Sequence, residues 1–253
     1  MKADIAVEGD RIIEIAPEIS SSAVSEIDAS GCIVTPGLID HHTHIYPLAK
    51  IGIPGSAACF ASGVTTAVDA GSTGCDTYEK YRSWIKAEKL GIRAYLNVCS
   101  NGLDNLPESM EDVDPSHMNV EKIQDTFDKY GSELLGLKLR TSRNIVKEFG
   151  WKPLEKAVEI GEKVGVPLMV HITNPPGPLP ELFGRLRPGD IVTHMYQNTG
   201  FHLLDDEGKK VSEAAWKARE RGVIFEAADA RAHFSFQVSE KAIHEKFYPD
   251  ILG

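Results

Sequence analysis

Histidines two residues apart close the first apolar segment of the chain. In Asp40-His41-His42-Thr43-His44, the side chains of His42 and His44 point the same way if the segment is a β-strand, because side chains alternate along a strand. Imidazole is a ligand for zinc, copper, iron or nickel, so the pair could hold one metal ion. The alternative is a pair of polar residues at a loop mouth. The spacing favours the metal site.

Two further histidines end later apolar segments of the chain. His171 follows Pro167-Leu168-Met169-Val170, and His194 follows Ile191-Val192-Thr193. Either histidine alone is more often a satisfied polar residue than a ligand. In parallel barrels, however, the chemistry sits at the carboxyl ends of the strands. Four histidines at three such ends therefore predict one metal-binding site.

A lysine interrupts another apolar segment. Lys138 lies within Leu135-Gly136-Leu137-Lys138-Leu139-Arg140, and a buried lysine is costly unless it is neutralised or paired. One interpretation is an ion pair at the barrel mouth. The other is a lysine carboxylated by carbon dioxide, whose two carbamate oxygens each bind one metal ion. The residues alone leave both interpretations open.

Three side chains near these positions are candidates for supporting roles. Arg140 shares the face of Lys138, so it could clamp a substrate carboxylate bidentately, or it could form a structural ion pair. Tyr196, two residues after His194, is placed to line the pocket. Asp69 ends another apolar segment and is expected to support a metal-binding histidine rather than bind metal itself. The other histidines, His41, His117, His202 and His244, have no convincing site context.

The site residues belong to a repeating pattern of short apolar segments and amphipathic stretches. Helix-like stretches such as 77–90 and 153–164 separate several of these segments, which predicts βα units and a parallel sheet. The predicted strands are 38–40, 64–68, 94–98, 134–139, 166–172, 190–195 and 223–227. A closed barrel needs eight units in about 250 residues, and about 35 residues precede the first strand. We therefore expect an α/β, TIM-type (β/α) barrel with seven of its eight strands.

The start of the chain differs from the rest. Alternating residues on both sides of Gly9-Asp10 predict a hairpin over 4–15, and a second β-like stretch covers 25–34. These pieces are too few to form a core alone. We expect a partial β-sandwich over 1–35 and the incomplete hydrolase barrel over 36–253.

Composition limits the function classes. The net charge of −10 disfavours nucleic acid and anionic membranes as partners. No apolar run approaches the roughly 18 residues of a membrane span, and no signal peptide is visible. The four cysteines, which form no C-x-x-C pair, are expected to be reduced. A cytoplasmic protein is the expectation.

Several motifs resemble the amidohydrolase superfamily over nearly the whole chain. Thr35-Pro36-Gly37-Leu38-Ile39-Asp40-His41-His42-Thr43-His44 is similar to the first-strand motif of that superfamily. Gly136-Leu137-Lys138-Leu139-Arg140, Val170-His171-Ile172-Thr173 and Asp190-Ile191-Val192-Thr193-His194 resemble its fourth, fifth and sixth strands in order. The details look like the dihydroorotase-related deacetylase branch.

The resemblance implies roles for the site residues. It implies two divalent metal ions, with zinc expected. His42 and His44 would bind the more buried ion, His171 and His194 the second, and carboxylated Lys138 would bridge them. It also implies a small β-sandwich built from both chain ends.

The chain departs from this pattern in two places. The aspartate that ends the eighth strand, completes the first metal site and moves the proton is expected beyond Gly253, because 249–253 would only begin that strand. Ala228-Asp229-Ala230 stands where relatives often carry a Gly-His-Gly-like turn, and His233 could substitute for that histidine. Neither Asp229 nor Asp250 is expected to replace the missing acid. We expect the chain by itself to be poorly soluble or very weakly active.

The function implied is hydrolysis of a C–N or acyl bond of a small polar substrate by metal-activated water. One alternative is a dihydroorotase that opens or closes a cyclic ureide. Another is an inactive fragment that still binds metal or a partner subunit. A small-molecule substrate is the expected partner, and a homo-oligomer is compatible with the sequence.

Overall fold

A β-hairpin opens the chain. In the computed structural model, which describes residues 2–45, 52–106, 110–230 and 233–253, β1 (Asp4–Glu8) pairs antiparallel with β2 (Arg11–Ala16). Gly9 has a φ of 61°, which lets the chain reverse between them. The predicted hairpin is confirmed. It belongs to the compact unit Met1–Pro36, and Gly37–Gly253 form a second unit.

The second β-stretch of the first unit, predicted over 25–34, is wrong. All ten residues are described, and none pairs in a sheet. The side chains of Ile27 and Ile33 are 89% and 93% exposed. Apolar residues favour a strand only where neighbouring strands satisfy their backbone groups and cover their side chains. That residues 1–35 belong to a β-sandwich stays a prediction.

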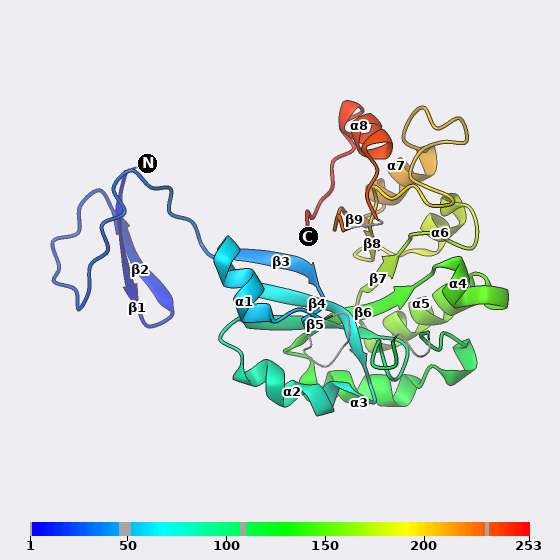
Figure 1. The fold of residues 1–253 in the computed structure, drawn as a ribbon, viewed down its shortest axis with the longest axis horizontal. Coiled ribbons are helices and arrows are strands. Elements are labelled where there is room, and N and C mark those ends of the chain that lie inside the picture. Colours follow the sequence, from blue (N-terminus) through cyan, green and yellow to red (C-terminus); the bar gives the residue numbers. More distant parts are fainter. Residues whose placement is uncertain (1, 46–51, 107–109, 231–232) are drawn as a thin grey trace. The chain divides into compact units, whose positions relative to one another are not determined.

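The second unit contains a sheet of seven parallel strands, paired in the order of the sequence (Figure 1). The strands are β3 (Leu38–Thr43), β4 (Val64–Gly74), β5 (Gly91–Asn97), β6 (Leu134–Arg140), β7 (Leu168–His171), β8 (Ile191–Thr193) and β9 (Ile224–Glu226). The seven predicted strands are confirmed. The sheet curls into a half-barrel, because His42 on β3 lies within hydrogen-bond distance of Glu226 on β9.

Helices connect the strands and cover the outer face of the sheet (Figure 1). Those predicted over 77–90 and 153–164 are confirmed as α2 (Tyr78–Ala87) and α5 (Lys152–Val164). Pro153 in the first turn and Gly165, with a φ of 77°, delimit α5. The remaining helical segments are α1 (Gly55–Cys59), η1 (Phe60–Ser62), η2 (Pro115–His117), α3 (Val120–Tyr130), α4 (Arg143–Val146), η3 (Lys147–Phe149), α6 (Leu179–Arg185), α7 (Glu213–Glu220) and α8 (Phe236–His244).

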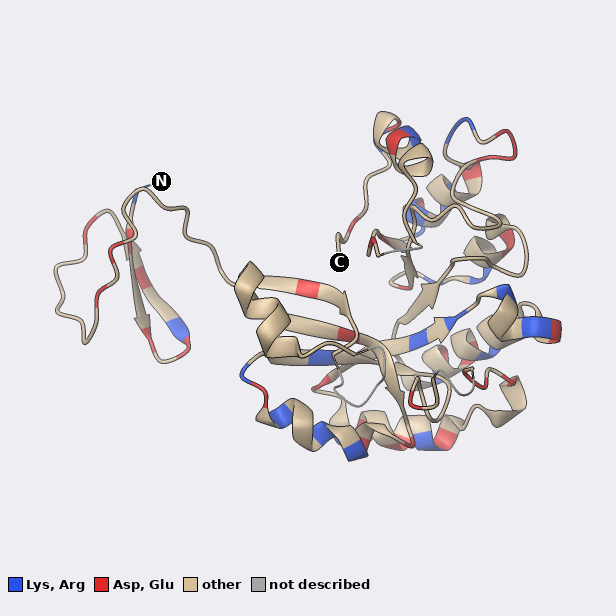
Figure 2. Cartoon of the chain, viewed as in Figure 1, with Lys and Arg blue, Asp and Glu red and all other residues tan. Residues whose placement is uncertain are grey.

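The surface of the helices is charged, and none of them suits a bilayer. Figure 2 shows acidic and basic residues spread along the helices of the second unit. Among the described residues, no helix combines the length and the apolarity that crossing a membrane requires. The cysteines are all free thiols, namely Cys32, Cys59, Cys75 and Cys99.

Alternation along the strands divides the apolar residues between two faces. Leu137 and Leu139 of β6 belong to the main core, together with buried residues of the covering helices. On the concave face a smaller cluster forms, composed of Val68, Ala70, Tyr95, Met169 and Ile191. Lys138 lies between the two leucines in sequence, so its side chain turns to the concave face and reaches the sulfur of Met169. The alternation of side chains along β6 therefore places the charged side chain of Lys138 on the concave face of the sheet.

The end of the chain extends the sheet beyond β9. Ile251 forms an isolated parallel bridge with Glu226, and the amide of Ala227 donates to the carbonyl of Ile251. This pairing agrees with the expectation that 249–253 begin an eighth strand. The Asp250 carboxylate accepts a hydrogen bond from the amide of Phe225. The carboxylate of Asp250, at the start of the segment 249–253, thus binds the backbone of β9.

Candidate metal centre

A β-bulge near the end of β3 sets the first part of the site. Asp40 pairs with Ala67 and Thr43 pairs with Asp69, so β3 advances three residues while β4 advances two. An extra residue in one strand breaks strict alternation. The consequence is that His41 and His42, although adjacent in sequence, both reach the carboxylate of Glu226.

Glu226 ends β9 and holds both of these histidines. Nδ1 of His41 lies 2.6 Å from Oε1 of Glu226, and Nδ1 of His42 lies 2.9 Å from Oε2. Burial raises the pKa of Glu226, but the hydrogen bonds of His41 and His42 outweigh it and hold the pKa below its usual value. Glu226 is therefore an anion that accepts an N–H from each ring. The side chain is fully buried, with no exposed surface.

Sequence reasoning missed Glu226 and assigned no site context to His41. The structure corrects both points, because His41 bonds Glu226 and its Nε2 also lies 3.3 Å from the hydroxyl of Tyr95. A signal for Glu226 was present. It is a charged residue within the apolar segment 223–227, as Lys138 is within its own segment.

His44 is oriented by a relay from β4. Its Nδ1 lies 2.9 Å from the hydroxyl of Ser72, and that hydroxyl donates to Oδ2 of Asp69 over 2.7 Å. Burial raises the pKa of Asp69 to about 6, although its hydrogen bonds act in the opposite direction. Asp69 thus supports His44 through Ser72, in keeping with the supporting role expected for it. With Nδ1 occupied, Nε2 is the nitrogen of His44 left for a ligand bond.

Lys138 of β6 lies beside these histidines. Its Nζ is 3.4 Å from Nε2 of His42 and 3.5 Å from the sulfur of Met169, and the residue is 4% exposed. Burial lowers the pKa of Lys138 to about 8, which increases the fraction of neutral amine near neutral pH. Gly71, with a φ of 90°, gives it room, because a Cβ at Gly71 would lie 2.5 Å from Cβ of Lys138.

The second part of the site comes from the ends of β7 and β8. The ring centroids of His171 and His194 are 4.7 Å apart, and the centroid of His194 is 4.8 Å from that of His42. Nδ1 of His194 lies 2.9 Å from the carbonyl oxygen of Ala228, to which it donates. The five positions singled out in the sequence, His42, His44, Lys138, His171 and His194, therefore come together.

A third ring joins this second group. Among the described residues, the nitrogens of His171, His194 and His233 form a set in which one atom from each ring lies within 4.8 Å of the others. The rings of His194 and His233 stack with centroids 4.2 Å apart. His233 thus lies at the site, whereas Asp229 falls in an exposed stretch beside it.

The backbone at these strand ends takes an uncommon conformation. Asn174, His194 and Ala228 follow β7, β8 and β9, and their φ values are 54°, 68° and 47°. Residues with a side chain rarely adopt positive φ, and such conformations cluster at functional sites.

The buried histidines are held in the neutral form that binds metal. Burial, followed by the charge of Lys138, lowers the pKa of His42 to about 4. Burial likewise holds the pKa of His44, His171 and His194 below the usual value. Only a neutral imidazole has a lone pair for a metal ion. The site therefore presents several ligand nitrogens without protons near neutral pH.

The two residues predicted to bind substrate differ in placement. A guanidinium nitrogen of Arg140 lies 3.2 Å from Oε2 of Glu111, while its buried Nε has no hydrogen-bond partner. Tyr196 packs in the main core near Phe234, and its hydroxyl also lacks a hydrogen-bond partner. Alternation does not apply to Tyr196, because the strand conformation ends before His194. Substrate binding by Arg140 and Tyr196 stays a prediction.

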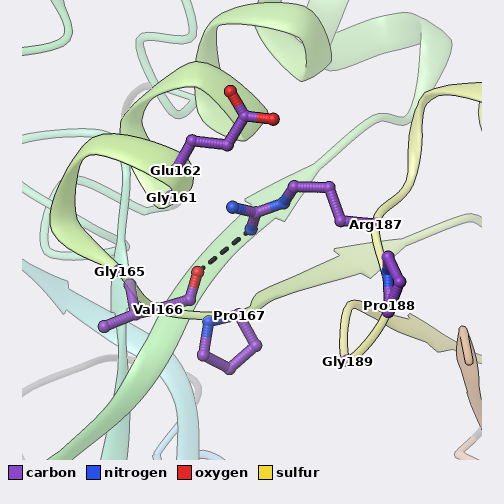
Figure 3. A pocket seen from close by; sticks show the side chains of 8 residues that line it. All are labelled: Gly161, Glu162, Gly165, Val166, Pro167, Arg187, Pro188 and Gly189. Atoms are coloured by element: carbon purple, nitrogen blue, oxygen red, sulfur yellow. Dashed lines mark hydrogen bonds between the residues drawn. The ribbon is translucent and has the colours of Figure 1, made fainter.

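One hollow of the structure lies away from these histidines. A cavity of about 410 Å³ is lined by residues at the starts of β7 and β8, including Val166 and Arg187 (Figure 3). Arg187 donates to the carbonyl of Val166 and pairs with Asp190. Residues at this end of barrel strands usually serve stability, whereas the histidines occupy the opposite end.

Known proteins with similar sequences include deacetylases. A deacetylase of Agrobacterium fabrum is 32% identical over 97% of this chain and 61% of the relative. A deacetylase of Enterococcus faecalis is 29% identical over 97% of this chain and 66% of the relative. The chain thus spans somewhat less than two thirds of the length of these curated relatives. No family model matches it.

Solved structures with the same fold include a deaminase and a dihydroorotase. The crystal structure of an adenine deaminase matches with a TM-score of 0.89 and 27% identity, covering 99% of this chain and 68% of that one. The crystal structure of a dihydroorotase matches with a TM-score of 0.85 and 30% identity, covering 98% and 66%.

Proposed function

Since the chain belongs to the amidohydrolase superfamily, within its dihydroorotase-like and deacetylase branch, we propose that the protein is a metal-dependent hydrolase. It cleaves a carbon–nitrogen bond other than a peptide bond, or an acyl bond, of a small polar substrate. The observation that carries this proposal is the convergence of two buried histidines, two partly buried histidines and Lys138 from four strand ends.

The donor set fits divalent metal ions of the zinc type. His42 and His44 would hold one ion, and His171 and His194 the other. Their Nδ1 atoms support this assignment, because those of His42, His44 and His194 are engaged with Glu226, Ser72 and Ala228. Outer hydrogen bonds of this kind fix the tautomer and leave Nε2 for the metal.

Lys138 would supply the bridging ligand as a carbamate. Its neutral Nζ would attack the carbon of carbon dioxide, form an N–C bond and release one proton, leaving an anion with two oxygens. Burial and the lowered pKa of Lys138 favour this reaction because they increase the neutral amine. Nε2 of His42, a group without charge, lies 3.4 Å from Nζ, and burial lowers the pKa of the amine more than the charges of Glu226, Asp69 and Glu111 raise it.

The chemistry of the site would then be hydrolysis by activated water. When bound, the metal ions would supply the Lewis acidity that activates a water molecule and polarises the carbonyl of the substrate. Glu226 and Asp69 would hold the histidine rings in place throughout. Arg140, at the same strand end as Lys138, would bind a substrate carboxylate through its partly exposed guanidinium.

The first experiment measures metal content. The full chain is expressed with zinc and bicarbonate, and its metal is counted by elemental analysis alongside His42→Ala/His44→Ala and the exposed-histidine control His244→Ala. We expect the wild type and the control to retain two zinc ions and the double variant to lose the more buried one. A folded wild type without transition metal would overturn the proposal.

A dihydroorotase-type activity is the second candidate, favoured by the 30% identity to a dihydroorotase over 98% of this chain. The two candidates differ in the substrate. Zinc-loaded protein is offered dihydroorotate in one set of assays and N-acyl amino acids and O-acyl hydroxy acids in another. Turnover of the acyl compounds alone supports the deacetylase, and turnover of dihydroorotate alone supports the cyclic amidohydrolase.

A further inference from the structure

His233 lies among the metal-binding histidines but has no place in the ligand set proposed above. Its ring centroid is 5.0 Å from that of His171 and 4.2 Å from that of His194. It comes from the segment between β9 and α8, whereas the other two end β7 and β8. The three histidines thus come from three different parts of the half-barrel, and their rings lie close together.

The ring of His233 is oriented in the manner of a ligand. Its Nδ1 lies 2.8 Å from the hydroxyl of Thr173, two residues after His171. The backbone amide of His233 donates to the carbonyl of Ala230 over 2.7 Å. With Nδ1 engaged by Thr173, Nε2 is left for another partner, as it is in His194.

The three rings bring nitrogen donors close together. One nitrogen from each of His171, His194 and His233 lies within 4.8 Å of the others, and His171 and His194 are 8% and 4% exposed. A set of imidazole nitrogens at this separation can hold a metal ion in common.

We propose that His233 is a third protein ligand of the metal ion held by His171 and His194. Three imidazoles are the protein ligands of one catalytic type of zinc site, so with His233 this ion would have a sufficient ligand set even without the carbamate of Lys138. Zinc–nitrogen bonds are about 2.0–2.1 Å long, so the set of nitrogens, which spans 4.8 Å, closes slightly on binding. The inference rests on the proposed function for the ion itself, and adds that this ion does not depend on Lys138.

The test compares metal binding in four forms of the full chain. These are the wild type, Lys138→Ala, His233→Ala and Lys138→Ala/His233→Ala, with His244→Ala on the exposed face of α8 as the matched control. Zinc is counted by elemental analysis, its affinity is measured by competition with a chromophoric chelator, and cobalt replaces zinc to record the visible spectrum. Circular dichroism and melting establish that each form folds.

We expect Lys138→Ala to keep one zinc ion. The additional His233→Ala change should weaken that ion at least as much as loss of an outer-shell partner does, which is about 10–100-fold. The cobalt spectrum of His233→Ala should also differ from that of the wild type, because the ligand set changes. If the alanine variant does not fold, His233→Gln replaces it, because its amide can still bond Thr173.

Each outcome separates this inference from the two-metal proposal. Equal zinc affinity in Lys138→Ala and the double variant overturns the inference, even if activity falls, and leaves the two-metal proposal intact. A single zinc ion in the wild type that is weakened in His233→Ala supports the inference and overturns the two-metal proposal. A wild type that binds no metal overturns both.

Discussion

Nδ1 of His42 lies 2.9 Å from Oε2 of Glu226, and this contact joins the first and the last strand of the parallel sheet. The two residues are 184 positions apart. The contact has two consequences, since it closes the concave side of the half-barrel and directs Nε2 of His42 toward Lys138.

Glu226→Gln removes the charge of this carboxylate and keeps its size. We expect a loss of about 1.5–3 kcal/mol in the free energy of unfolding, the range for a hydrogen bond to a charged group. Zinc affinity at His42 should also fall, by about 10–100-fold. Urea unfolding and chelator competition measure the two effects. Glu162→Gln, an exposed position on α5, is the control, and equal stability of both variants would contradict the prediction.

Carboxylation of Lys138 should depend on pH through its amine. The pKa of Lys138 is lowered to about 8 by burial, so neutral amine increases as pH rises through 8 and then reaches a plateau. At a fixed concentration of dissolved carbon dioxide, the metal-free protein should form carbamate roughly tenfold faster at pH 9 than at pH 7. Carbon-13 NMR with labelled carbon dioxide follows the reaction. A signal that persists in Lys138→Ala would refute the assignment.

The metal-free protein should lose stability in mild acid. Burial lowers the pKa of His42 to about 4, while in the unfolded chain it is near the usual 6.5. Between these values the unfolded state binds more protons, so stability is fully present above about pH 6.5 and is lost as pH falls toward 4. His44, His171 and His194 add losses of the same sign. Chemical denaturation at several pH values measures this, and His42→Gln should flatten the dependence.

Gly71→Ala should disturb the site without touching a ligand. Its new Cβ would lie 2.5 Å from Cβ and Cγ of Lys138, and the φ of 90° disfavours any side chain there. We expect displaced Lys138, weaker metal binding and a lower melting temperature. Gly184→Ala on α6 is the matched control, because its Cβ would meet nothing within 4 Å. It should leave metal binding unchanged and stabilise the helix by about 0.5–1 kcal/mol. Equal metal binding in the two variants would argue against a steric role of Gly71.

Much of the fold could be predicted from the sequence because its elements are locally determined. Seven apolar segments of strand length form the seven strands, since each is covered on one face by helices. The stretch 25–34 is also partly apolar but lacks a neighbouring strand, and it forms none. Apolarity therefore predicts a strand only together with a partner, and the partner is a property of the tertiary fold.

The sequence predicts the site residues that lie near the carboxyl ends of the strands, because these ends converge. His42, His44, Lys138, His171 and His194 come together because parallel strands place their carboxyl ends at one edge. Glu226 and the role of His41 required the curl of the sheet and the bulge in β3. Tyr196 could not be placed by alternation, since His194 leaves the strand conformation with a φ of 68°.

The separation of 184 positions between His42 and Glu226 also determines when this half of the site can form during synthesis of the chain. Chains are synthesised at about 5–20 residues per second, so His42 is made roughly 10–40 s before Glu226. During that interval the histidines of β3 lack the carboxylate that orients them. The nascent chain therefore cannot assemble this half of the site, and its selection of a metal ion is deferred until β9 has been made.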